Sequence, residues 1–146
     1  MQYWIKVAGT GDNPFDRGDW RRAATSGCGS TALLRFPRRA RVSPGDRFIL
    51  FAAGSHAYFG EGRIYAVAEV QTGLQPSPRE RWPWQVEAPI LISGPRLEHC
   101  PMITDIDVER RSLRRQSHIR LDEVRGRQAE ELITNAAARF GALDAL

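Results

Sequence analysis

The segment from Val42 to Val70 constrains the fold of this chain more than any other part of the sequence. It opens with Ser43-Pro44-Gly45-Asp46, where proline occupies the second position of a type I or type II turn and presets its φ angle. The continuous apolar run Phe48–Ala52 follows, as is typical of a strand covered on both faces. A short loop then leads to Ile64–Val70, which is rich in β-forming residues. The pattern predicts a sharp turn, a buried strand, a loop and a second strand.

Further strands are predicted on either side of this unit. Tyr3–Val7 is rich in β-formers, which indicates that the N-terminal segment is fixed in a sheet. From Trp84 onward, the segment Trp82–Pro89 alternates as a half-buried strand does, and its prolines favour an edge or a bulge. Ile90–Ile92 is expected to extend that strand, whereas the conformation of Thr31–Phe36 stays open.

Two helices complete the predicted fold. Asp16–Thr25 is expected to form a short helix with Trp20 on its apolar face. Asp122 is a suitable N-cap for a C-terminal helix that runs to about Phe140. The apolar residues of this helix follow helical spacing, namely Ala129, Leu132, Ile133, Ala136, Ala137 and Phe140. Several strands, an early helix and a late helix predict an α+β, mainly β fold, in which a small, strongly bent sheet closes toward a barrel.

Length and composition favour one domain covering residues 1–146. The sequence contains no apolar run of about 18 residues, so no membrane-spanning helix is expected. No basic region followed by a long apolar run marks a signal peptide. The two cysteines, Cys28 and Cys100, are too few for a disulfide framework. These features make the cytoplasm the expected compartment.

Positive charge is concentrated near the C-terminal end. The chain has a net charge of +4, and Lys6 is its only lysine. Residues 110–127 hold seven arginines against Asp122 and Glu123, a local charge of +5. Such a segment suits a polyanionic partner, although a codon-biased genome explains the preference for arginine over lysine equally well.

Five features, in this order, resemble the EVE domain, a member of the PUA-like superfamily that also holds the YTH and ASCH domains. They are Tyr3-Trp4-Ile5, the turn Ser43–Asp46, the strand end Ala68-Glu69-Val70, the segment Trp82–Val86, and Leu113–Leu121 with an acidic helix start after it. The resemblance covers nearly the whole chain. It implies a PUA-like β-barrel with flanking helices, including a C-terminal one, and a pocket on the side of the barrel.

The resemblance also implies a function. EVE and YTH domains are nucleic-acid modules, and the better understood ones hold a modified base, flipped from RNA or DNA, in an aromatic cage. They are not expected to be enzymes by themselves. Many members place a tryptophan where this chain has Gly27 and Cys28. A cage wall here would have to come from Trp20 or Phe36, or be missing.

Three groups of residues are candidates for contact with a nucleic acid. A tryptophan ring can stack on a base, although core packing is the ordinary role of this residue. Arginine and lysine can hold phosphates, although a single basic side chain usually belongs to a solvated surface. The loop Ser26–Thr31 can offer hydrogen bonds, unless it is an ordinary loop. The candidates are Trp20, Trp82 and Trp84 for bases, Lys6, Arg111, Arg114 and Arg115 for phosphates, and Ser30 and Thr31 for hydrogen bonds.

No cofactor or metal site is predicted. His99-Cys100 could join Cys28, His56 or His118, but no pair has a zinc-binding spacing.

Two other functions stay open. One is an ASCH-type enzyme acting on RNA or a nucleotide, for which His118 with Glu69 or Arg120 is the available constellation. The other is a protein-interaction module that uses an exposed strand edge.

Glu69, which lies within an apolar strand, is expected to pair with an arginine such as Arg63. The sequence leaves the oligomeric state open.

Overall fold

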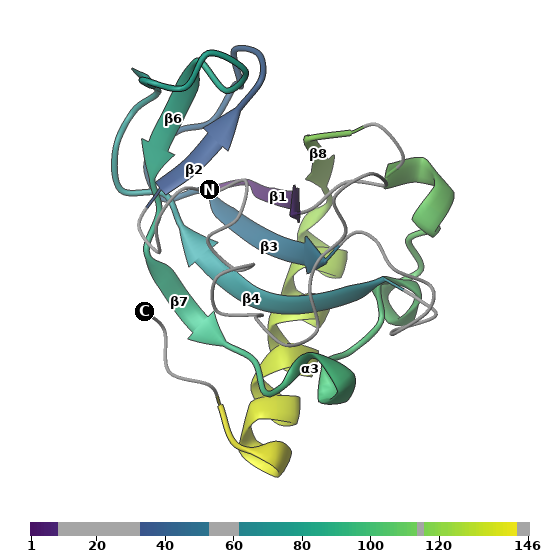
Figure 1. The fold of residues 1–146 in the computed structure, drawn as a ribbon. Helices are drawn as coiled ribbons and strands as arrows, with labels where there is room; N and C mark the ends of the chain where they lie inside the picture. The colour runs from purple at the N-terminus through teal and green to yellow at the C-terminus, as the bar shows by residue number, and fades with distance from the viewer. Residues whose placement is uncertain (9–32, 53–61, 114–115, 143–146) are drawn as a thin grey trace.

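The computed structural model describes residues 1–8, 33–52, 62–113 and 116–142, and Figure 1 shows their arrangement. A five-stranded sheet has the order β7-β4-β3-β1-β8, and a three-stranded sheet has the order β2-β6-β5. The larger sheet consists of β1 (Tyr3–Ala8), β3 (Arg47–Ala52), β4 (Arg63–Glu69), β7 (Ile90–Ser93) and β8 (His118–Leu121). The smaller sheet consists of β2 (Leu33–Phe36), β5 (Gln75–Pro76) and β6 (Trp84–Glu87).

The described helices all lie after β7 in the chain. Three short 3-10 helices, η2 (Leu97–His99), η3 (Ile103–Ile106) and η4 (Arg110–Leu113), precede β8. The long helix α3 spans Glu123–Phe140, and Asp122 caps it by accepting a hydrogen bond from the backbone N–H of Arg125 at 2.9 Å. The predicted N-cap and helix end are therefore confirmed. The helix predicted for Asp16–Thr25 lies outside the described residues.

The sheets form layers around two hydrophobic cores. In the view of Figure 1, β2 and β6 lie at the top and α3 lies at the bottom, behind the large sheet. One core contains side chains from both sheets, among them Phe36, Phe48 and Val86. The other lies between the large sheet and α3, and it includes Ile5, Ile49 and Ile133. Strands β3 and β4 contribute to both cores, which confirms that the apolar run after the turn is covered on both faces. The fold is α+β and mainly β, as predicted.

Two predictions about the sheets were wrong. Ile90–Ile92 does not extend the preceding strand, because β6 pairs with β2 and β5 whereas β7 pairs with β4. The break falls at Pro89, which has no N–H to continue a ladder and whose carbonyl instead accepts from the N–H of Glu69 at 3.1 Å. Among the described strands, β7 and β8 remain the edges of the large sheet, so that sheet does not close into a barrel. Helix α3 and the small sheet cover its two faces instead.

The turn before β3 is a type II turn that carries a buried carboxylate. Gly45 has φ of +91°, which type II geometry requires at the third position, and the N–H of Asp46 donates to the carbonyl of Ser43 at 3.0 Å. The Asp46 side chain is buried and accepts three hydrogen bonds. Oδ1 accepts from the N–H of Gln2 at 2.9 Å, and Oδ2 accepts from the Trp4 indole and the N–H of Ser43, both at 3.1 Å. This carboxylate therefore fixes the start of β1 beside the start of β3.

Gly126 has a packing role in α3 that outweighs its low helix propensity. It is buried, and a Cβ atom added to it would lie 2.2 Å from Cγ of the Tyr3 ring. The absence of a side chain therefore allows the helix to approach β1.

Replacing Gly126→Ala should destabilise the protein by about 1–3 kcal/mol, because overpacking against Tyr3 outweighs the better helix propensity of alanine. Urea unfolding would measure the difference. The exposed Asn135→Ala change in the same helix should leave stability unchanged or slightly raised. A Gly126→Ala protein as stable as the wild type would contradict the packing role.

Replacing Asp46→Asn should lower the free energy of unfolding by about 1–3 kcal/mol, because an amide nitrogen would face N–H donors that now meet a carboxylate oxygen. Asp122→Asn makes the same chemical change at an exposed helix cap, where asparagine serves about as well. Urea unfolding of both variants should show a clearly larger loss at position 46. Equal losses would show that the buried carboxylate has no special role.

Candidate functional site

Strand alternation places four polar or aromatic side chains on one face of the large sheet, at the edge formed by β1 and β8. Lys6 pairs with His118 across the ladder, and Trp4 pairs with Arg120. Residues directly opposite in an antiparallel pair lie on the same face. The intervening residues Tyr3 and Ile5 point to the opposite face and pack in the core beneath α3. The β1–β8 edge is thus polar and aromatic on one face only.

Lys6 lies at the centre of this edge and is fully buried. Its Nζ atom donates to the Ser117 hydroxyl at 3.3 Å and to the carbonyl of Val7 at 3.4 Å. The same atom lies 5.6 Å from the centre of the Phe36 ring and 5.1 Å from that of Trp82. Removal of an ammonium group from water costs several kcal/mol unless other groups replace its hydration. The hydroxyl, the carbonyl and the two ring faces contribute to that replacement.

The aromatic rings around Lys6 contact one another. Trp4 stacks on Phe48 with 6.0 Å between ring centres, and it lies 5.9 Å from the His118 ring. The Phe36 ring meets His118 edge to face at 4.9 Å. Because Asp46 holds the Trp4 indole N–H, the position of this ring is fixed by the turn before β3. The small sheet contributes Phe36, and the large sheet contributes Trp4 and His118.

Each of the three described tryptophans near this edge has a cation over its ring. Lys6 lies over Trp82, the Arg39 guanidinium is 5.2 Å from the centre of Trp84, and that of Arg120 is 5.5 Å from Trp4. A cation within about 6 Å of the ring centre is attracted by the negative face of the ring. Four such contacts gather here, counting Lys6 over Phe36. We call this group the seam, and it consists of Trp4, Lys6, Phe36, Trp82, Trp84, His118 and Arg120.

His118 is neutral at physiological pH. Burial, together with the nearby charges of Lys6 and Arg38, lowers the pKa of its imidazole from 6.5 to about 4. Its Nδ1 atom is buried and has no hydrogen-bond partner among the described residues. A neutral imidazole in this position can donate or accept one further hydrogen bond.

The structure brings together three of the residues that the sequence singled out. Lys6, Trp82 and Trp84 all belong to the seam, and both tryptophans are partly exposed. Lys6, predicted to contact a phosphate, is fully buried, with its Nζ atom over the Phe36 and Trp82 rings. Trp20, Ser30, Thr31, Arg114 and Arg115 lie outside the described residues, and Arg111 lies in η4 without a described side chain.

The sequence pattern does not reveal the role of two seam residues. It places Trp4 in a strand without a functional role, and it offers Phe36 only as a wall of an aromatic cage. The signal that could have revealed Trp4 is its position two residues before Lys6, because residues i and i+2 of a strand share a face. No local signal indicates that Phe36 meets His118, which lies 82 positions further along the chain.

Ion pairs offset part of the positive charge of residues 110–127. Arg125 pairs with Asp122 at 2.7 Å, and Arg127 pairs with Glu123 at 2.8 Å. Arg120 belongs to the seam. At least two of the seven arginines in this segment thus have acidic partners at the start of α3.

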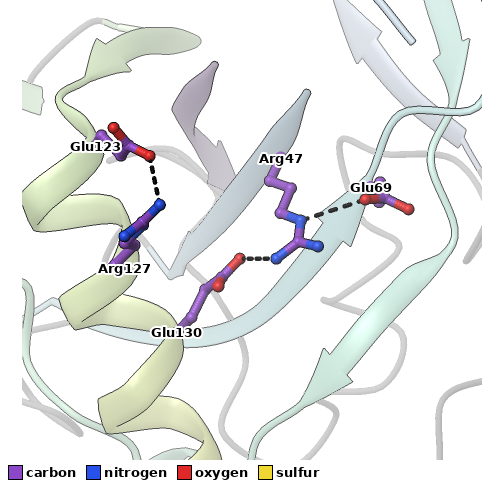
Figure 2. A network of polar contacts seen from close by, with 5 residues as sticks. All are labelled: Arg47, Glu69, Glu123, Arg127 and Glu130. Atoms are coloured by element: carbon purple, nitrogen blue, oxygen red, sulfur yellow. Dashed lines mark hydrogen bonds and ion pairs between the residues drawn. The ribbon is translucent and has the colours of Figure 1, made fainter. Parts of the chain in front are cut away.

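Glu69 is not a partner of His118. It pairs with Arg47 at 3.3 Å, rather than with Arg63 as expected, and Arg47 also pairs with Glu130 of α3 at 2.7 Å (Figure 2). The network therefore lies on the helix-facing side of the sheet, where burial and the Glu130 carboxylate also raise the pKa of Tyr3. His118 lies on the other side and three strands away, a separation of at least ~14 Å at the usual strand spacing. No general-base pair of His118 and Glu69 can form in this arrangement.

Other reactive groups are few in the described part of the chain. Burial raises the pKa of the Cys100 thiol to about 12, which leaves it protonated and unreactive. Within residues 1–8, 33–52, 62–113 and 116–142, no three histidine, cysteine or acidic side chains are placed to hold a metal ion. The described helices include none that is long and apolar enough to cross a membrane.

Comparison with known proteins gives structural similarity alone. No protein-family model matches the sequence, and no curated protein matches it. A crystal structure of a Pseudomonas putida protein is 12% identical, with a TM-score of 0.49, over 89% of this chain and 98% of that one. A hypothetical protein from Leishmania major is 14% identical, with a TM-score of 0.49, over 90% and 96% of the two chains. An Agrobacterium tumefaciens protein is 12% identical, with a TM-score of 0.49, over 99% of this chain and 100% of that one.

The imidazole of His118 should titrate with a midpoint of about 4. Since this pKa is below that of an unfolded histidine, the unfolded chain takes up the proton first, and stability should fall as pH drops from about 6.5 to about 4. NMR titration of the His118 ring protons measures the midpoint directly. Lys6→Met should raise it, because one positive charge is removed, but burial should keep it below 6.5. A wild-type midpoint near 6.5 would contradict the described environment.

Proposed function

We propose that this protein is a nucleic-acid-binding module that stacks exposed bases against the tryptophans of the seam. The observation that carries the proposal is the gathering of Trp4, Trp82 and Trp84 on one seam, each with a cation over its ring. Stacking of a base on an aromatic side chain is worth about 1–3 kcal/mol and tolerates any base. Guanidinium groups beside the rings supply the matching charge for phosphates. Trp82 and Trp84 are the partly exposed rings, so they would meet the bases.

The proposal includes the membership that the sequence resemblance implies, the EVE branch of the PUA-like superfamily. Its support is the order of the five sequence features and the position of α3 directly after β8. Recognition of a modified base in RNA or DNA belongs to the same proposal, as does a cytoplasmic location.

Binding is a better interpretation than catalysis for this site. A general base works best with a pKa near the working pH, whereas the pKa of His118 lies at about 4. The Glu69 carboxylate faces the helix on the other side of the sheet, so it cannot act as a partner of His118. The seam supplies ring faces and fixed positive charge, which suit recognition.

Fluorescence anisotropy with short RNA and DNA oligonucleotides, with and without modified cytosine or adenine, tests the proposal at low salt. Trp82→Ala should weaken binding about 5- to 150-fold, which corresponds to the loss of about 1–3 kcal/mol of stacking. Trp82→Phe keeps an aromatic face and should retain more of the affinity. Circular dichroism would establish that both variants are folded.

Arg127→Gln is the matched control, because Arg127 is exposed on α3 and paired with Glu123. It should leave the affinity unchanged. Failure of the wild-type protein to bind any of the oligonucleotides at low salt would refute the proposed function.

A further inference from the structure

The small sheet and its connections carry a second group of arginines, outside residues 110–127. Residues 33–41 contain four arginines and no acidic residue. Residues 75–87 add two more, together with Glu80 and Glu87. These two segments therefore carry a charge of +4, as large as the net charge of the whole chain. We call the six residues the small-sheet arginines, and they are Arg35, Arg38, Arg39, Arg41, Arg79 and Arg81.

These arginines differ from the ones on the helix side in having no acidic partner among the described residues. Five of them are exposed, and in the described part of the chain none of the six forms an ion pair. Arg35, the partly buried one, donates from Nε to the Gln85 side chain at 3.3 Å. Arg47, Arg125 and Arg127, in contrast, all pair with acidic side chains at or near α3. Among the described residues, arginines without an acidic partner thus gather on the small sheet and its connections.

The small-sheet arginines border the seam. Arg39 lies over Trp84, and the charge of Arg38 reaches His118 strongly enough to lower its pKa. Arg79 and Arg81 belong to a closed turn that leads into Trp82, in which the N–H of Trp82 donates to the carbonyl of Arg79 at 3.2 Å. A hydrogen bond from the N–H of Ser77 to the carbonyl of Pro83, at 2.7 Å, closes the same loop. Charge and ring faces therefore come from the same short segments.

We infer that the small-sheet arginines bind the phosphodiester backbone of a single-stranded nucleic acid whose bases stack in the seam. This inference rests on the proposed function and specifies its ligand. A phosphate backbone is bound by exposed cations, and five exposed arginines lie in these segments without an acidic partner among the described residues. Ring faces beside these cations are useful only for bases that are free to stack, and in a duplex the bases already stack on each other. An acidic protein surface would match the charge but would make no use of the tryptophan faces.

The salt dependence of binding tests the inference. For a single strand, the slope of log K against log salt is about −0.7 per phosphate contact. The triple variant Arg38→Gln, Arg39→Gln, Arg41→Gln should therefore make the slope shallower by about 2. The measurement uses the full chain and a fluorescent single-stranded oligonucleotide of mixed sequence over a series of KCl concentrations. Because all three side chains are exposed, the variant should fold, and circular dichroism would establish this.

A matched control removes the same charge elsewhere. The triple variant Arg96→Gln, Arg125→Gln, Arg127→Gln alters three exposed arginines away from the small sheet and should keep the wild-type slope. If the wild-type protein binds but both triple variants change the slope equally, the inference is wrong while the proposed function stands. Tighter binding of a duplex, or equal binding of poly-glutamate, would likewise overturn it. If the wild-type protein binds no oligonucleotide at low salt, both the inference and the proposed function are wrong.

Discussion

The buried carboxylate of Asp46 is the interaction on which the arrangement of the sheet depends. It accepts hydrogen bonds from Gln2, Trp4 and Ser43, so it joins the first strand to the turn that starts β3. The same turn bonds to the end of β4, because the N–H of Gly45 donates to the carbonyl of Val70 at 2.8 Å. A slip of β1 by one residue would leave this carboxylate without its donors and would exchange the two faces of the strand.

Strand alternation then separates two kinds of chemistry across one sheet. Tyr3 and its neighbours face α3, where Arg47 links Glu69 to Glu130 and fixes the helix against the sheet (Figure 2). Trp4 and Lys6 face the small sheet and form the seam with His118. On the helix side, Arg47 is paired with both Glu69 and Glu130. On the other side, cations lie over aromatic rings, and arginines on the surface remain free of acidic partners among the described residues.

Local signals in the sequence were sufficient for most elements but not for their pairing. The proline and glycine of the turn, the run after it and the Asp122 cap each depend on near neighbours in the chain, and these elements were predicted correctly. The separation of β6 from β7 depends on which distant strand each one meets, and local alternation carries no such information. Trp82 and Trp84 could be proposed because an indole ring can stack on a base. The burial of Lys6 and its contacts with Phe36 and Trp82 arise from the packing of two sheets.

NMR of the tryptophan indole N–H groups during titration with a single-stranded oligonucleotide tests the central claim most directly. The four signals can be assigned by single Trp→Phe variants. We expect the indole signals of Trp82 and Trp84 to shift, because bases stack on these rings, while backbone amides along α3 stay in place. Shifts confined to α3, with both indoles unmoved, would show that a nucleic acid binds elsewhere and that the seam serves packing alone.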